Sequence, residues 1–229
     1  MLTRILEPEV MDTVSEAVDY DQMDHSGVNR LFVDDLLAAL QAKPTPGSIQ
    51  IFDAGTGTAQ IPLELMGRGI DAAVTATDLA GQMLIVAQQN VNAADFAKSI
   101  RLVLADCKQL PDANATYDVV MSNSIVHHIP NPLQVLAELW RILKPGGLLF
   151  VRDLMRPDDG PTLDGLVQTY AGTSNSHQQQ MFRESLHAAL TVDEVRDLLK
   201  HVGIPATAVQ ATSDRHWTIV ATKSDADRL

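Results

Sequence analysis

The stretch IQIFDAGTGTA, residues 49–59, decides the fold of this chain. It joins a short apolar run, Ile49–Ala54, to a turn that contains Gly55 and Gly57, and an amphipathic segment follows from Ala59. A buried strand that ends in a glycine-rich turn before a helix is typical of doubly wound parallel sheets. Glycine allows the tight turn and lets a ligand lie against bare backbone, while the helix N-terminus offers unpaired N–H groups.

The same alternation of short apolar runs and longer periodic segments continues along the chain. Strands are predicted at 49–54, 72–77, 100–105, 117–122 and 148–151, and helices at 59–66 and 81–94. A further helix is predicted from Pro132, with Asn131 as its cap and Lys144-Pro145-Gly146-Gly147 as its stop. Strands separated by helices predict βαβ units, and therefore a largely parallel sheet covered on both faces.

The two ends of the chain read differently from this centre. The first forty or so residues look helical and acidic, with an apolar stripe at 24–41 that stops at the breaker cluster 43–47. Residues 155–190 are polar and show no clear period. A capping box at Thr191 and Glu194 then starts a helix. Two late strands, 206–210 and 217–222, are expected to form an antiparallel hairpin.

The bulk composition is that of one globular domain. The 229 residues are 45% hydrophobic and 20% charged, and the net charge is −12 with scattered Lys and Arg. Nucleic acid and anionic lipid are therefore poor partners. No apolar run is long enough for a membrane span, and the start has no secretory signal. A single cysteine suits a reducing compartment, so we expect a cytoplasmic protein; nothing indicates its oligomeric state.

Three acidic residues close the first three predicted strands: Asp53, Asp78 and Asp106. In a parallel sheet their side chains converge on one crevice, where such folds bind ligands. The spaced glycines alone are compatible with a tight connection that binds nothing, or with a dinucleotide site. A carboxylate at Asp53 lies unhelpfully close to a pyrophosphate, whereas it suits a cationic ligand. The three acids together indicate a ligand with an adenosine end, a positively charged tail and no phosphate.

The chain resembles the class I S-adenosylmethionine-dependent methyltransferases, nearest to the small-molecule branch that includes the ubiquinone and menaquinone methyltransferases. The matching segments, in family order, are Ile51–Gly57, Thr77–Ala80, Leu104–Cys107, Tyr117–His128 and Leu143–Gly147. The resemblance implies a Rossmann-like, doubly wound α/β sheet of seven strands, mostly parallel with an antiparallel last strand. It also implies one domain over 1–229, made of a helical N-terminal cap (1–47), a cofactor-binding core (48–154), an acceptor-binding insertion (155–190) and a C-terminal helix with a strand pair (191–229).

The resemblance further assigns roles around S-adenosylmethionine, whose product is S-adenosylhomocysteine. The turn should hold the methionine portion, Asp78 the ribose hydroxyls, and Asn123 should face the sulfonium end. Ala59 departs from the glycine common in the family, which affects local packing. The full expected cofactor set is Tyr20, Asp53, Ala54, Gly55, Thr56, Gly57, Asp78, Leu79, Met83, Asp106, Cys107 and Asn123.

The acceptor is not identified by the sequence beyond a small molecule. His127 and His128 are the candidate general bases, although one packing inward and the other facing solvent is the plainer reading. We expect no metal site, because adjacent histidines should point in different directions and no His-Glu-x-x-His spacing occurs. The expected acceptor contacts are Arg152, Met155, Met181, Phe182 and Arg183. The alternative functions are a non-catalytic protein that binds S-adenosylmethionine and a nicotinamide-dependent oxidoreductase.

Overall fold

A computed structural model describes residues 2–7, 10, 12–41 and 48–224 of the chain. The breaker cluster 43–47 therefore lies outside the described residues. Seven strands form one sheet in the order β3-β2-β1-β4-β5-β7-β6. The strands are β1 Ile49–Ala54, β2 Ala72–Asp78, β3 Ile100–Leu104, β4 Tyr117–Asn123, β5 Leu143–Leu154, β6 Val209–Ala211 and β7 His216–Thr222. The first five pair in parallel, and β7 pairs antiparallel with both β5 and β6, so the predicted fold class is confirmed.

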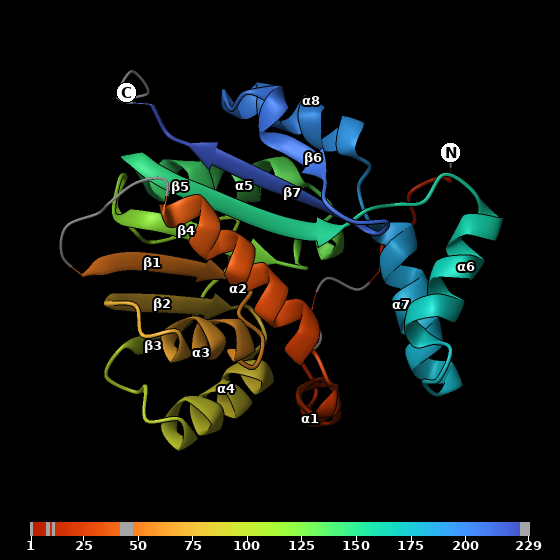
Figure 1. Cartoon of the computed structure of the whole chain (residues 1–229), viewed down its shortest axis with the longest axis horizontal. Helices are drawn as coiled ribbons and strands as arrows, with labels where there is room; N and C mark the ends of the chain where they lie inside the picture. Colours follow the sequence, from red (N-terminus) through yellow and green to blue (C-terminus); the bar gives the residue numbers. More distant parts are fainter. Residues whose placement is uncertain (1, 8–9, 11, 42–47, 225–229) are drawn as a thin grey trace.

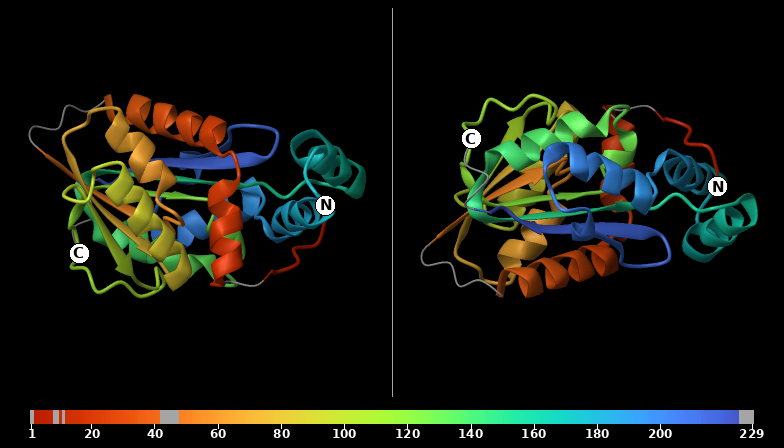
Figure 2. Two further views of the ribbon diagram at one scale, coloured as in Figure 1. Left: turned by 90° about the horizontal axis from the view of Figure 1, so that it is seen from below. Right: turned by 90° about the horizontal axis from the view of Figure 1, so that it is seen from above.

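Helices cover both faces of this sheet (Figures 1 and 2). One face carries α2 Ser26–Gln41, α3 Gln60–Gly67 and α4 Gly81–Ala93, and the other carries α5 Pro132–Ile142 and α8 Val192–Val202. Because successive strand residues face opposite ways, neighbours in the chain enter different cores: Ile51 packs under the first group of helices and Phe52 under the second. The strands are apolar on both faces for this reason.

Residues 155–190 are not the open polar stretch that the sequence indicates. They contain two packed helices, α6 Gly160–Ala171 and α7 Ser176–Ala188. Asp159 caps the first through the Thr162 N–H, and Asn175 caps the second in a capping box with Gln178. The polar run before Met181 conceals the helical period of apolar residues, because α7 buries only a narrow stripe of its surface. Figure 1 shows this helical pair beyond the C-terminal end of β5, at the end of the sheet where α1 (Val14–Gln22) also lies.

Three smaller expectations also need correction. Strand β5 begins at Leu143, directly after α5, because its first residues join the sheet before a bulge opposite β4. Asn131 makes no side-chain capping bond to α5. The predicted strand 206–210 is shorter, since Ala206–Ala208 forms a 3-10 turn, η2, before β6. The capping box of α8 and the antiparallel hairpin are confirmed.

The described residues before α1 form no helix or strand, so the expectation that they are helical is wrong. Arg4 holds them in place. Its Nε donates to the carbonyl of Ala188 at 2.7 Å, and its Nη2 donates to the carbonyls of His127 and Ile129 at 3.1 Å each. The N-terminal segment therefore ties α7 to the turn after β4, the 3-10 helix η1 (Val126–His128). No described helix is long and apolar enough to cross a membrane.

Candidate functional site

The glycine turn after β1 requires glycine twice, for backbone and for packing reasons. Gly55 and Gly57 have φ of +68° and +55°, a region that side chains disfavour. A Cβ on Gly55 would lie 2.1 Å from Cγ2 of Ile125, so that side chain packs directly on the turn. A Cβ on Gly57 would lie 3.4 Å from the ring of Tyr20. The turn is thus a bare backbone surface that side chains from two distant segments enclose.

Ala59 is the residue at which the turn departs from the resembled family. It caps α3 in the left-handed conformation, with φ of +63°, and its methyl group is fully buried. The departure therefore puts a conformational strain on the backbone as well as a change in packing, at a position where glycine would be relaxed.

Asp53 presents a buried carboxylate at the start of this turn. Its side chain is almost fully enclosed, and its Oδ2 accepts no hydrogen bond from the described residues. Burial raises the pKa of Asp53 to about 7; the nearby Thr56 hydroxyl opposes this shift and the charge of Asp78 adds to it. A buried carboxylate without a donor is costly, so the site suits a ligand that brings a cation or a donor.

Asp78 closes β2 and holds the turn from the other side. Its Oδ2 accepts from the N–H of Gly57 at 2.7 Å, and its Oδ1 accepts from the N–H of Ala80 at 2.9 Å. Burial raises the pKa of Asp78, while these N–H donors oppose the rise. Each carboxylate oxygen has a second lone pair, so two ligand hydroxyls can still bind here.

Asp106 and Cys107 follow β3 and form the third side. Asp106 Oδ1 accepts from the backbone N–H of Lys108 at 2.9 Å and lies 3.2 Å from its Nζ. Cys107 is buried with its Sγ 3.6 Å from the Thr77 hydroxyl, and burial raises the pKa of this thiol to about 11. The cysteine therefore stays a neutral, apolar wall of the site at physiological pH.

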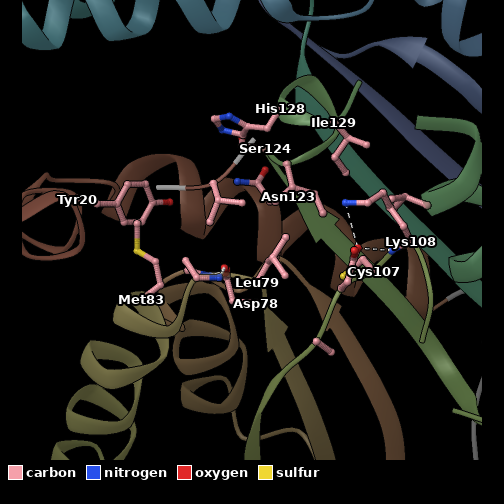
Figure 3. Close-up of a pocket in the computed structure, with 18 residues that line it drawn as sticks. Tyr20, Asp78, Leu79, Met83, Cys107, Lys108, Asn123, Ser124, His128 and Ile129 are labelled. Atoms are coloured by element: carbon pink, nitrogen blue, oxygen red, sulfur yellow. Dashed lines mark hydrogen bonds and ion pairs between the residues drawn. The ribbon is translucent and has the colours of Figure 1, made fainter. Parts of the chain in front are cut away.

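Most of these side chains surround one pocket, whose volume is about 830 Å³ with open solvent included. Figure 3 shows Asp78, Leu79 and Met83 on one side, Cys107 and Lys108 on another, and Asn123 between them. Tyr20 reaches over from α1. Asp53 and Thr56 line a smaller hollow that shares Tyr20, Gly55 and Asn123 with the pocket. Ala54 is enclosed in β1 and touches neither space with its side chain.

Tyr20 is the polar side chain that reaches over the pocket from α1. Burial raises the pKa of Tyr20 to about 12, and the carboxylates of Asp78, Asp53 and Asp21 add to the rise. The phenol therefore stays protonated. Asp21 is held in turn by the side-chain amides of Gln60 and Asn90, which ties α1 to α3 and α4.

The two histidines after β4 differ in environment. His127 is enclosed and does not line the pocket, whereas His128 does. His127 Nδ1 lies 2.5 Å from Asp153 Oδ1 at the end of β5. Burial alone would lower the pKa of His127, but the carboxylate of Asp153 outweighs it and raises that pKa.

The expectation that the two rings point in different directions is wrong. Their centroids lie 4.1 Å apart at 34°, and both rings face one carboxylate oxygen, Oε1 of Glu7. The N-terminal segment that Arg4 holds supplies this carboxylate.

The expected acceptor contacts do not gather in one place. Arg152 is buried away from the pocket, where it binds Asp35 at 2.6 Å and stacks over Phe32. Phe182 packs between α6 and α7, and Arg183 pairs with Asp164 at 2.6 Å. Met155 packs at the end of β5, in a bridge to Leu190.

Met181 is the member of that group that reaches an open surface. It lines a groove between α1 and α7, together with Tyr20 and Met23. The groove shares Tyr20 with the pocket, so the two spaces meet at that ring.

Several lining residues escape the sequence reasoning. Ile125, Ser124 and Ile129 lie in the turn after β4, and Val10 comes from the N-terminal segment. Asp153 was detectable, because it ends β5 as Asp53 and Asp78 end β1 and β2. Glu7 carries no local signal, since only the tertiary path of the N-terminal segment brings it to the histidines.

Comparison with known proteins places this site in context. A family model described as a methyltransferase domain matches residues 52–151. The chain is similar to a demethylmenaquinone methyltransferase of Protochlamydia amoebophila, with 30% identity over 201 residues that cover 81% of each chain. It is also similar to a ubiquinone/menaquinone biosynthesis C-methyltransferase of Geotalea daltonii, with 27% identity over 65% of this chain and 63% of that protein. A solved S-adenosylmethionine-dependent methyltransferase structure from Aquifex aeolicus shares the fold, with a TM-score of 0.63, 21% identity, and coverage of 92% of this chain and 98% of that one.

Proposed function

Because the chain belongs to the class I S-adenosylmethionine-dependent methyltransferases, near the ubiquinone and menaquinone branch, we propose that its pocket presents the cofactor's methyl group to a small aromatic acceptor. The observation that carries the proposal is the position of the bare turn Gly55–Gly57 between two carboxylates, with Asp78 in the pocket and Asp53 in the adjoining hollow that shares Gly55 and Tyr20 with it. A buried carboxylate oxygen without a donor, a half-occupied carboxylate and a backbone cradle together fit a cationic, ribose-containing ligand.

The residue roles follow from these partners. We propose that Asp53 faces the ammonium of the methionine portion, and that Asp78 receives the ribose hydroxyls on its remaining lone pairs. Asp106, Cys107, Leu79 and Met83 would enclose the adenine. We propose that Asn123 faces the sulfonium end and that Tyr20 covers the cofactor. The turn residues Ala54, Thr56 and Gly57 would hold the methionine portion through their backbone.

The chemistry is an in-line displacement. S-adenosylmethionine supplies a methyl carbon activated by the sulfonium; the acceptor atom bonds to that carbon as the carbon–sulfur bond breaks, and the electron pair goes to sulfur. The chain's own task is to orient the acceptor and exclude water. Tyr20, Ile125 and Val10 close the pocket around the reacting end.

The acceptor proposal rests on the relatives and on the groove beside Tyr20. The related Protochlamydia protein is named for demethylmenaquinone, so we propose a hydroxylated aromatic ring as the acceptor. Met23 and Met181 supply adaptable thioether surfaces along the groove, which suit a flat ring. His128 lies at the pocket wall, whereas His127 is too enclosed to touch the acceptor.

The remaining proposals concern partners and location. The net charge of −12 supports a small molecule over nucleic acid as the acceptor. The single buried thiol supports a cytoplasmic setting.

Calorimetric titration with S-adenosylmethionine, S-adenosylhomocysteine and NAD tests the cofactor half. We expect both sulfur ligands to bind and NAD to give no heat of binding. Binding of NAD alone would favour a nicotinamide-dependent oxidoreductase and refute the proposal. The acceptor half is tested by S-adenosylhomocysteine release with reduced naphthoquinones, simple catechols and aliphatic amines. Release with amines alone would refute the aromatic acceptor, and tight cofactor binding without release for any acceptor would favour a non-catalytic binding protein.

A further inference from the structure

Glu7, His127 and His128 bring three ligand atoms to one point at the edge of the pocket. Glu7 Oε1 lies 3.4 Å from His127 Nε2 and 3.1 Å from His128 Nδ1, and all three atoms lie within 4.8 Å of one another. Tetrahedral zinc sites with bonds of about 2.0–2.1 Å separate their ligand atoms by about 3.3 Å. Two of the three edges of such a site are therefore already present.

Asp153 fixes the chemistry of the first histidine. It is fully buried, accepts from the backbone N–H of Val126, and lies 2.5 Å from His127 Nδ1. A proton on Nδ1 leaves the Nε2 lone pair free to bind a cation, and Nε2 lies 3.4 Å from Glu7 Oε1. This carboxylate–histidine arrangement is the usual outer-shell support of a metal-binding imidazole, because it sets the tautomer and raises the basicity of the ligand atom.

The oxygen between the rings has no hydrogen-bond donor. Glu7 Oε1 is buried and accepts no hydrogen bond from the described residues, while Oε2 of the same carboxylate accepts from Ser185 Oγ at 3.3 Å. Lone pairs of a carboxylate and a neutral imidazole repel each other at these distances unless a cation lies between them. A proton or a metal ion satisfies that requirement.

The charges around the cluster favour a cation. The guanidinium of Arg4 binds carbonyls of the same turn and repels a cation. Three carboxylates face the cluster against this one positive charge: Glu7, Asp153 and Glu184.

We propose that Glu7, His127 and His128 bind one divalent transition-metal ion of the zinc type. Two imidazoles and one carboxylate are a ligand set that such ions favour, and they leave a coordination position open. The site joins the N-terminal segment to the η1 turn and lies beside the acceptor end of the pocket, since His128 lines both. The ion therefore fixes Glu7 against the η1 turn. The proposal does not depend on the identity of the acceptor.

Metal titration of the full chain after EDTA dialysis tests the proposal directly. Zn²⁺ is titrated against a chromophoric chelator, and Co²⁺ is titrated by its d–d absorption. We expect about one equivalent of either ion and a rise in melting temperature with Zn²⁺, because binding to the folded state stabilises it. Absence of stoichiometric binding by the wild-type chain at micromolar metal would overturn the proposal.

Variants locate the site. Glu7→Gln and His128→Gln remove ligands without emptying the core, and each should weaken Zn²⁺ binding by more than tenfold. Asp153→Asn tests the outer shell, for which a loss of about 10- to 100-fold is expected. His201→Gln is the matched control, since His201 is exposed on α8 and bonds only its own helix. Unchanged affinity in the Glu7 and His128 variants, or an equal loss in the His201 control, would refute the assignment. Circular dichroism and melting temperature without metal establish that each variant folds.

Discussion

Because of Asp53, cofactor binding should depend on pH, and binding should release the proton of this carboxyl. In the free protein, burial raises the pKa of this carboxyl to about 7, so it is largely protonated at pH 6. A cationic ligand favours the ionised form, and binding must therefore remove the proton. The apparent dissociation constant scales with 1 + 10^(pKa − pH), which predicts binding about fivefold weaker at pH 6 than at pH 7. The affinity thus rises with pH through the pKa of the free protein.

Titration calorimetry in two buffers of different ionisation enthalpy measures both effects. We expect about 0.9 proton released per site at pH 6 and about 0.5 at pH 7, from the same titration curve. The range ends at pH 7 because the ligand's own α-amino group, with a pKa of about 7.7–8.0, loses a growing share of its protons above it. Tyr20 and Cys107 stay silent in this range, since their pKa values are about 12 and 11.

Asp53→Asn is the control, because it keeps the shape and removes the titrating group. The variant should bind more weakly overall and show a nearly flat profile with little proton release between pH 6 and 7. Asp78, whose pKa is also raised, remains in the variant, so any residual slope belongs to it. Equal proton release by wild type and variant would refute the assignment of Asp53 to the cationic end of the ligand.

The other predictions concern the turn, the ribose site and Arg152. Asp78→Ala should weaken S-adenosylmethionine binding by about 10- to 100-fold in calorimetry, because it removes charge-assisted hydrogen bonds of about 1.5–3 kcal/mol; unchanged affinity would remove Asp78 from the site. Gly55→Ala should lose cofactor binding and lower the melting temperature, since its Cβ would lie 2.1 Å from Ile125 in a left-handed backbone; the double variant with Ile125→Ala should recover part of the stability if the collision is the cause. Arg152→Met should lower the free energy of unfolding by about 1–2 kcal/mol in urea, because a buried hydrogen-bonded charge is lost, and leave cofactor affinity unchanged. Weaker cofactor binding with an unchanged free energy of unfolding would contradict this and indicate that Arg152 contacts the ligand.

Much of the lining of the pocket was predictable from the sequence because its parts are local. The spacing of Gly55 and Gly57 sets a turn within a few residues, and Asp78 and Asp106 each end a strand that an apolar run defines. Parallel pairing then aligns the ends of β1, β2 and β3 at one edge, so a list of strand-terminal acids becomes a list of neighbours. That inference needs only the order of the elements and the rule that such sheets bind ligands at their carboxyl ends.

The acceptor end depends on contacts that no local pattern encodes. Residues 155–190 contain two helices whose polar faces conceal a narrow apolar stripe. The packing of α6 against α7 places Phe182 and Arg183, both on α7, against α6. Arg152 lies near the C-terminal end of β5, the end at which the pocket lies, yet strand alternation points its side chain to the face beneath α2. The sequence therefore predicts the end of the strand at which Arg152 lies, but not the face of the sheet to which its side chain points.

The sequence by itself determined the elements, the glycine turn and the three converging acids, because each arises from interactions between residues close in the chain or from one regular pairing rule. Only the tertiary structure decided what meets the histidines after β4. Glu7 reaches them because Arg4 fixes the N-terminal segment against the turn, and Asp153 reaches them because β5 lies beside β4. Such long-range contacts depend on the balance of packing over the whole molecule, so neither partner carries a signal in its own neighbourhood.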